Sequence, residues 1–202
     1  MAHLMTRRVS DDVERSTGLM AGVAFLIPGL LAAGLAVAAV DPAAPHGTAP
    51  QMSYISETVA VTGAVEQPLS LSVTDLEGFP PQQIGEVDMI CDTGVNIGKK
   101  ENLRGVLLRD ILDRAKLKAP APRDFRKMAV IARATDDYVA VFSWAEIFNS
   151  DVGDHVIVYF RKDGAPLGVE EGQIALISTT DQRTGPRHVR WLNRIEVRQL
   201  VD

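Results

Sequence analysis

The chain has 202 residues, of which 46% are hydrophobic, 23% charged and 5% aromatic, and its formal net charge is −5. This composition is that of an ordinary globular domain and excludes a disordered or fibrous chain. The acidic balance argues against nucleic-acid partners, because neutralising phosphates needs clustered positive charge. Cys91 is the only cysteine, so no disulfide can form within the chain and no site can be built from several thiolates.

A long uncharged run occupies residues 18–40, and basic side chains, among them Arg7 and Arg8, precede it. Its 23 residues are enough to cross about 30 Å of hydrocarbon as a helix. The run ends in small residues that also suit a signal peptidase, so a cleaved export signal and an uncleaved membrane anchor are both open. A buried core helix is the third interpretation, but soluble helices usually carry a polar stripe. We expect residues 1–40 to be a signal peptide or anchor.

This interpretation places the rest of the chain in the periplasm or another extracytoplasmic space, attached to the inner membrane if the run is not cleaved. Residues 41–55 are rich in Pro and Ala and predict a linker, because such a composition cannot build a core. We expect residues 56–202 to form one α+β domain dominated by short strands. The repeated strand–helix–strand pattern of a parallel nucleotide-binding sheet is not seen.

The first elements of this domain are two strands, predicted at residues 57–65 and 69–73 from their alternating polarity. Thr74 and Glu77 have the spacing of a capping box and predict one helical turn, which Pro80 would stop.

The next predicted strand places Val87, Met89 and Cys91 on one side and ends at the turn residues 92–94, so Cys91 lies where a strand gives way to a loop. An amphipathic helix follows at residues 105–117. Its apolar face contains Leu107, Leu108, Ile111, Leu112 and Ala115.

The second half of the domain is again rich in strand patterns, interrupted by a short helix that the Ser143/Glu146 capping box would begin. In the last strand, Val189, Trp191, Ile195 and Val197 are expected on a core face, and Arg190, Arg194 and Arg198 on a solvated face. The strands are predicted at residues 127–134, 138–142, 155–160, 173–178 and 189–197.

Three features are candidates for chemistry. Residues 94–100, GVNIGKK, suggest a phosphate loop or, with their imperfect spacing, a lysine-tipped surface loop. The basic run at residues 183–198 indicates either a solvated strand face or an anion site in its loop, where Gly185 would let backbone N–H groups approach a ligand. Cys91 is either a buried apolar thiol or a metal ligand.

Six segments, in order along the chain, resemble the molybdopterin-binding domain of the sulfite oxidase family. The resemblance covers residues 56–197 and implies a single strand-rich domain of the sulfite oxidase type that binds the molybdenum cofactor, molybdopterin. It implies that Cys91 is the catalytic thiolate ligand to molybdenum and that Arg187, His188 and Arg190 help to hold the pterin and its phosphate. The segments are VTGAVEQPLSLSVTDL, VDMICDTG, LRGVLLRDILDRA, DDYVAVFSWAEIF, KDGAPL and GPRHVRWLNRIEV.

Two functional hypotheses follow from these patterns. The first is an exported or membrane-anchored oxidoreductase with a small-molecule substrate and a membrane or periplasmic redox partner. The alternative is a cofactor-free, degenerate domain that acts as a periplasmic ligand-sensing or partner-binding module. One departure from the family pattern concerns the substrate: no basic residue follows Cys91 directly, and Asp92 would repel an anion.

Overall fold

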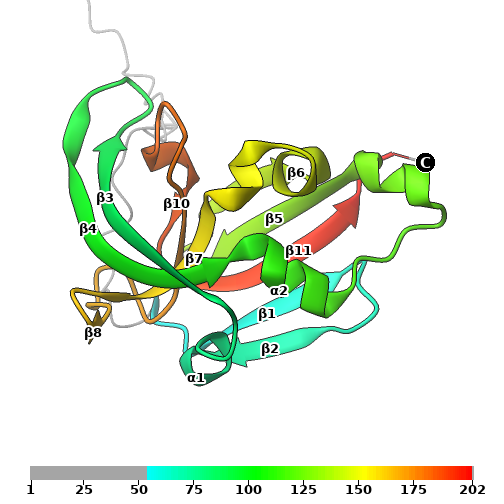
Figure 1. The fold of residues 1–202 in the computed structure, drawn as a ribbon, viewed down its shortest axis with the longest axis horizontal. Helices are drawn as coiled ribbons and strands as arrows, with labels where there is room; N and C mark the ends of the chain where they lie inside the picture. The colour runs from blue at the N-terminus through cyan, green and yellow to red at the C-terminus, as the bar shows by residue number, and fades with distance from the viewer. Residues whose placement is uncertain (1–53, 202) are drawn as a thin grey trace, which may run out of the picture. The chain divides into compact units, whose positions relative to one another are not determined.

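The computed structural model describes residues 54–201, in which short strands form two sheets and the helices are few and short (Figure 1). The strand-rich α+β architecture expected from the sequence is therefore confirmed for this part of the chain. The predicted leader at residues 1–40 and most of the predicted linker lie outside the described residues. Among the residues described, no helix is long and apolar enough to cross a membrane.

The first sheet has the strand order β2-β1-β11-β5-β6. Neighbouring strands are antiparallel except β1 and β11, which run parallel and pair Val61 with Ile195. The two ends of the domain therefore meet in the middle of this sheet. Its strands are β1 (Thr58–Gly63), β2 (Leu69–Ser72), β5 (Met128–Ala134), β6 (Val139–Ser143) and β11 (Leu192–Gln199).

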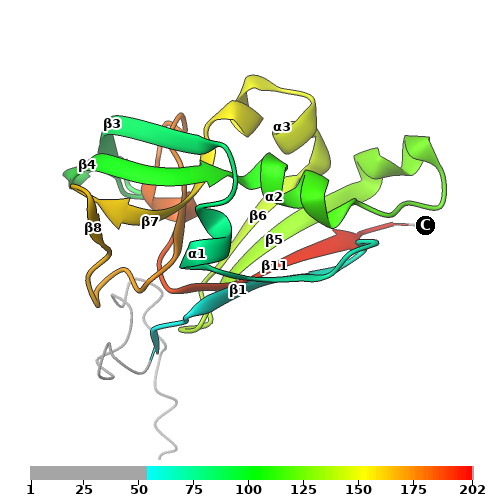
Figure 2. The same cartoon turned by 60° about the horizontal axis from the view of Figure 1, so that its bottom comes forward.

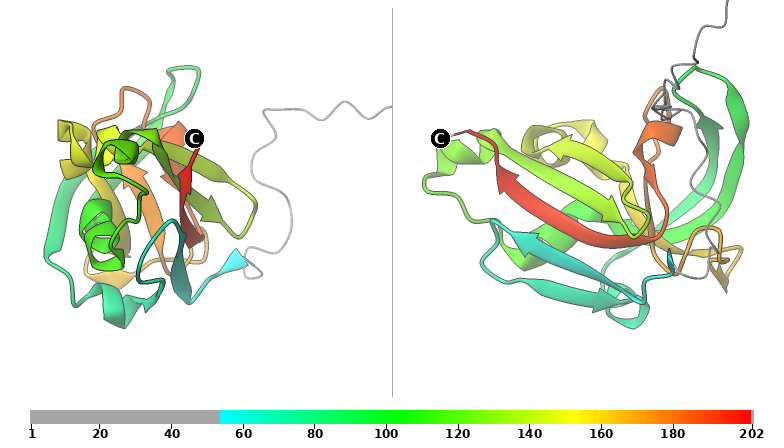
Figure 3. Two further views of the ribbon diagram at one scale, coloured as in Figure 1. Left: turned by 90° about the vertical axis from the view of Figure 1, so that its right-hand side faces the viewer. Right: turned by 180° about the vertical axis from the view of Figure 1, so that it is seen from behind.

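The second sheet has the order β10-β9-β7-β4-β3, with β8 paired to β7, and is antiparallel throughout. A long curved hairpin of β3 and β4 forms one edge, and the loop at its tip lies beside β10 (Figures 1 and 3). The strands are β3 (Pro81–Ile90), β4 (Asn96–Leu107), β7 (Val156–Lys162), β8 (Ala165–Pro166), β9 (Ala175–Ser178) and β10 (His188–Val189).

The main hydrophobic core contains residues of both sheets and of the two helices α2 and α3, which lie over the first sheet (Figure 2). In α2, the predicted face is buried at Leu108, Ile111, Leu112 and Ala115, which confirms the periodicity argument. The helical elements are α1 (Val73–Leu76), α2 (Leu108–Ala115), α3 (Trp144–Phe148) and three 3-10 turns, η2 (Pro122–Lys127), η3 (Asp151–Asp154) and η4 (Gly185–Arg187).

Strand β4 differs from the prediction, which assigned residues 94–100 to a loop and began the helix at residue 105. The structure has one strand at Asn96–Leu107, and α2 begins only at Leu108. Most of its first half is exposed, so it has no alternation of buried and exposed residues by which a sequence pattern could identify it. The hydrogen bonds of the β3–β4 hairpin define it instead.

One of the two predicted capping boxes is wrong. Ser72, not Thr74, caps α1: Asp75 N–H donates to Ser72 Oγ at 3.3 Å, and Ser72 N–H donates to Asp75 Oδ2 at 2.9 Å. Aspartate fills the third position as well as glutamate does, since a carboxylate can reach back to the cap N–H. The predicted Ser143/Glu146 box is confirmed at the start of α3.

The predicted last strand is in fact two strands, β10 and β11, which belong to different sheets. The chain bends at Trp191, whose φ is +50°, and Arg190 turns back so that its guanidinium carbon lies 4.5 Å from the Trp191 ring. Val189, Ile195 and Val197 are buried as predicted, and Arg194 and Arg198 are exposed. An alternating pattern does not reveal a change of sheet, because both sheets need the same alternation.

Candidate functional site

Cys91 follows β3 directly, in the turn that leads to β4, and its side chain is partly exposed. Its backbone N–H donates to Val95 O at 3.0 Å, which closes the turn. Its sulfur lies 2.9 Å from Thr93 Oγ1, and this hydrogen bond lowers the pKa of the thiol below its ordinary value of 9.0. The turn therefore presents an accessible sulfur that is stabilised as a thiolate.

The loop before β10 is fastened to this end of β3 by Thr184. The buried Thr184 hydroxyl donates to Asp88 O at 2.6 Å and accepts a hydrogen bond from Ile90 N–H at 2.9 Å. At the next position, a Cβ on Gly185 would lie 2.9 Å from Ile90 O and 3.3 Å from Cys91 Cα. Glycine is therefore needed for the loop to approach Cys91 this closely.

Two neighbouring hollows result from this packing, and Ile97 and Gly185 line both of them. The first, which we call the cysteine hollow, measures about 380 Å³. The second, the basic hollow, measures about 370 Å³. The cysteine hollow is lined by Cys91, Asp92, Ile97, Tyr138, Gly185 and Pro186. The basic hollow is lined by Met89, Ile97, Gly98, Lys99, Lys100, Gly185, His188 and Arg190.

A buried chain of polar groups lies behind the basic hollow. Glu171 is only 3% exposed, pairs with the Lys100 ammonium and accepts a hydrogen bond from the Tyr159 hydroxyl. Burial raises the pKa of Tyr159, so its phenol stays neutral, and its oxygen lies 2.8 Å from His188 Nε2. The Tyr159 hydroxyl donates its one proton to Glu171. Its oxygen can therefore only accept a hydrogen bond from His188, so the proton of that bond is on His188 Nε2.

Of the predicted site residues, Cys91, His188 and Arg190 lie at the two joined hollows, and Arg187 lines neither. The Arg187 guanidinium donates to Asp181 Oδ2 at 2.6 Å and to Glu146 Oε1 at 2.7 Å. It thereby connects the loop to α3. Its predicted role in holding the pterin phosphate stays a prediction.

Glu146 has two functions, since its carboxylate also completes the capping box of α3. Burial by itself would raise the pKa of Glu146. The hydrogen bonds from Ser143 and Arg187 outweigh this effect and hold the pKa below the ordinary value of 4.5. The negative charge is therefore stabilised where the loop meets the helix.

The sequence analysis missed three residues of this region as site residues: Tyr138, Glu171 and Thr184. Lys100 belongs to the GVNIGKK motif, which the sequence analysis gave as a candidate phosphate loop. The motif is part of an antiparallel hairpin and not of a strand–loop–helix, so it is no nucleotide phosphate loop. Tyr138 donates to Pro186 O at 2.9 Å, a partner 48 positions away. No local pattern indicates such pairs.

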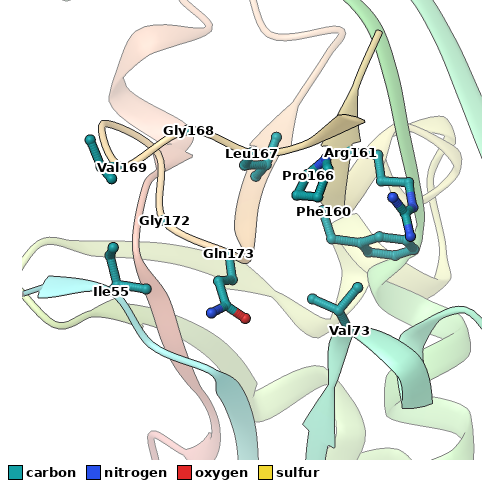
Figure 4. A pocket seen from close by; sticks show the side chains of 10 residues that line it. All are labelled: Ile55, Val73, Phe160, Arg161, Pro166, Leu167, Gly168, Val169, Gly172 and Gln173. Atoms are coloured by element: carbon teal, nitrogen blue, oxygen red, sulfur yellow. The ribbon is translucent and has the colours of Figure 1, made fainter. Parts of the chain in front are cut away.

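A third hollow, of about 430 Å³, opens elsewhere, beside β8 and the loop that follows it (Figure 4). Its walls are mostly apolar, including Val73, Phe160 and Leu167. Its one charged lining residue, Arg161, is bound to Glu77 at 2.8 Å. Its lining therefore offers no nucleophile and no carboxylate or histidine.

Within residues 54–201, no group of three or more His, Cys, Asp or Glu side chains could hold a metal ion. A metal at Cys91 would therefore need further ligands from a cofactor. The donor set fits the molybdenum cofactor in this respect: a soft thiolate stands next to a hollow with cationic walls, as a dithiolene-bound metal and an anionic phosphate require.

Comparison with known families agrees with this chemistry. The family described as "Oxidoreductase molybdopterin binding domain" matches residues 46–201, and the chain belongs to this family. The resemblance stated from the sequence is thereby confirmed.

Among solved structures, 28 chains match. One is the crystal structure of the sulfane dehydrogenase SoxCD from Paracoccus pantotrophus, with a TM-score of 0.52 and 19% identity. The alignment covers 76% of this chain and 40% of that chain, so the present chain spans less than half of its length. This similarity shows a shared fold. A search of curated proteins found no match.

Proposed function

We propose that this chain is an oxidoreductase domain that binds the molybdenum cofactor, with Cys91 as its protein ligand, and acts on a small-molecule substrate. The observation that carries the proposal is that the cysteine hollow and the basic hollow share Ile97 and Gly185 in their walls. The thiol of Cys91 therefore lies next to the cations of the basic hollow. Membership of the molybdopterin-binding family supports the same assignment.

The residues of the chain would share the work of holding the cofactor. His188 and Arg190 would bind its anionic part, and Cys91 would bind the metal. When bound, the cofactor supplies the redox chemistry, transferring an oxygen atom or electrons. Thr184 and Gly185 would keep the loop before β10 next to the thiolate, since they fasten it to the end of β3.

The molybdenum content of the purified protein tests this proposal. Protein from an exporting host with intact molybdopterin synthesis should retain molybdenum, measured by mass spectrometry of the metal. Cys91→Ser should lose it and all redox activity, because a hydroxyl is a far harder ligand than a thiolate, and should keep the same circular dichroism spectrum. Thr180→Ser, at an exposed position, is the control and should retain the metal.

A second candidate function is the cofactor-free binding module. The observation in its favour is that cations of this region are neutralised within the chain: Lys99 by Glu86, Lys100 by Glu171 and Arg187 by Asp181. Wild-type protein without molybdenum, together with an unaltered Cys91→Ser variant, would support this candidate and contradict the first.

We further propose that the domain is exported, on the basis of the uncharged run at residues 18–40. Alkaline phosphatase, which is active only outside the cytoplasm, would be fused to the C-terminus of the full chain. The fusion should be active, and replacing two leucines of the run by arginine should abolish the activity. An inactive wild-type fusion that is soluble in the cytoplasm would contradict export.

A further inference from the structure

The walls of the cysteine hollow carry only one charged side chain, the Asp92 carboxylate. Ile97, which is 65% exposed, and Tyr138 provide apolar surface on other sides. A small molecule that approaches the Cys91 sulfur therefore meets a negative charge and apolar groups, with no cation in the same hollow.

The Asp92 charge also acts on Tyr138, which lines the same hollow. Burial raises the pKa of Tyr138 first, and the negative charges of Asp136 and Asp92 raise it further. Asp92, Cys91 and Tyr138 line the same hollow, so the carboxylate acts on a molecule held there.

The cations near Cys91 are arranged on the other side of Ile97 and Gly185, in the basic hollow. Lys99 is 2.6 Å from Glu86, and Lys100 is paired with Glu171. Under the function proposed above, an anionic part of the cofactor would occupy the same hollow and use up the remaining positive charge. An oxyanion beside Cys91 would then face Asp92 without a counter-ion, which costs affinity.

Resting on that proposed function, we propose that the substrate of the cysteine hollow is a small uncharged molecule and not an oxyanion. Asp92 is the residue that sets this specificity. Its charge disfavours anions at the sulfur, while Ile97 and Tyr138 provide contacts that a neutral, partly apolar molecule can use.

Alkylation of Cys91 tests the charge preference without any cofactor. Because Cys91 is the only cysteine, every alkylation event reports on this sulfur. Rates would be measured at one pH with uncharged iodoacetamide and with anionic iodoacetate. Their ratio cancels the fraction of thiolate, which is common to both reagents, and N-acetylcysteine amide gives the reference ratio for a thiol without a protein field.

In the wild-type protein, the rate ratio of iodoacetate to iodoacetamide should lie below the reference and rise with added salt, because salt screens repulsion. Asp92→Asn should raise the ratio about three- to tenfold at low ionic strength, which is the effect of removing one charge a few ångströms away. Glu66→Gln removes an equal charge in the turn between β1 and β2 and should leave the ratio unchanged. Circular dichroism would confirm that both variants fold.

A wild-type ratio above the reference, a ratio that falls with salt, or no response to Asp92→Asn would overturn the proposal. Each result would mean that the cations of the basic hollow dominate the field at the sulfur. Alkylation would be measured on protein from a host without molybdopterin synthesis, because a metal bound to the Cys91 sulfur would block the reaction. A missing metal in protein from the exporting host would then contradict the proposed function only, and an anion-favouring ratio would contradict the substrate class only.

Discussion

Thr184 joins two parts of the site through one hydroxyl group. The hydroxyl is buried and satisfies both Asp88 O and Ile90 N–H at the end of β3, 96 and 94 positions away along the chain. A side chain of the same shape without the hydroxyl would leave these two backbone groups buried and without that partner. This one hydroxyl therefore helps to hold the loop before β10 next to Cys91.

We predict that Thr184→Val lowers the free energy of unfolding by about 1–3 kcal/mol, the usual cost of leaving buried polar groups without a hydrogen bond. Urea denaturation of both proteins would measure the difference. Thr180→Val, at an exposed position in the same connection, should change the free energy by less than about 0.5 kcal/mol. Equal midpoints for Thr184→Val and wild type would show that the loop is held by other contacts.

At the scale of elements, strands β4 and β7 come unusually close at Gly105. A Cβ at this position would lie 2.3 Å from Val158 O and 2.6 Å from Tyr159 Cα. These are backbone atoms, which cannot move without breaking the pairing of the two strands. The same pairing places Tyr159, whose hydroxyl lies 2.8 Å from His188 Nε2, behind the basic hollow.

Gly105→Ala should therefore destabilise the protein by about 1–3 kcal/mol or more, the range of overpacked sites. Gly85→Ala is the matched control, because Gly85 lies in the adjacent strand β3 and its Cβ would meet nothing within 4 Å. This control should be neutral or slightly stabilising. If thermal denaturation gave the same loss for both variants, crowding between β4 and β7 would not be the cause.

Helix α2 contributes to the core through one face only. Leu112 is fully buried in the main cluster, and the next residue, Asp113, is exposed. Leu112→Ala should cost about 2–5 kcal/mol, because it removes apolar contacts and leaves a cavity. Asp113→Ala should stay within about 0.5 kcal/mol in the same denaturation series. An unchanged midpoint for Leu112→Ala would contradict the assignment of the buried face.

For the molecule as a whole, the loss of stability in acid should depend in part on the ion pair between Arg187, in the loop before β10, and Glu146 of α3. Hydrogen bonds hold the pKa of Glu146 below its ordinary value of 4.5 in the folded protein. The stabilisation is then complete above that ordinary value and is lost as the pH falls through the lower pKa of the folded state.

The prediction is that Glu146→Gln is less stable than wild type at pH 7 and that the difference shrinks as the pH falls below 4.5. Denaturation midpoints across this range would measure it. Glu66→Gln, at an exposed position, serves as the control and should give a curve parallel to that of wild type. A difference that stays constant with pH would mean that the charge of Glu146 contributes nothing.

Several structural features of this protein could be predicted from local patterns in its sequence. The buried face of α2, the capping box at Ser143 and the position of Cys91 at a strand end all follow from the spacing of side chains within a few residues. Such patterns are reliable because one face of an amphipathic element must leave water wherever the element packs. The ordered segments of the resemblance also identified the family correctly.

Tertiary structure alone decided the rest. Strand β4 is defined by pairing and not by burial, and the left-handed backbone at Trp191, which sends the chain from one sheet to the other, is not encoded by the residue type. The partners of Thr184 and Lys100 are 96 and 71 positions away. Local periodicity carries no information about contacts at such separations, because they form only when two sheets and a loop are packed together. That packing is also what places the Cys91 thiol next to the cations of the basic hollow.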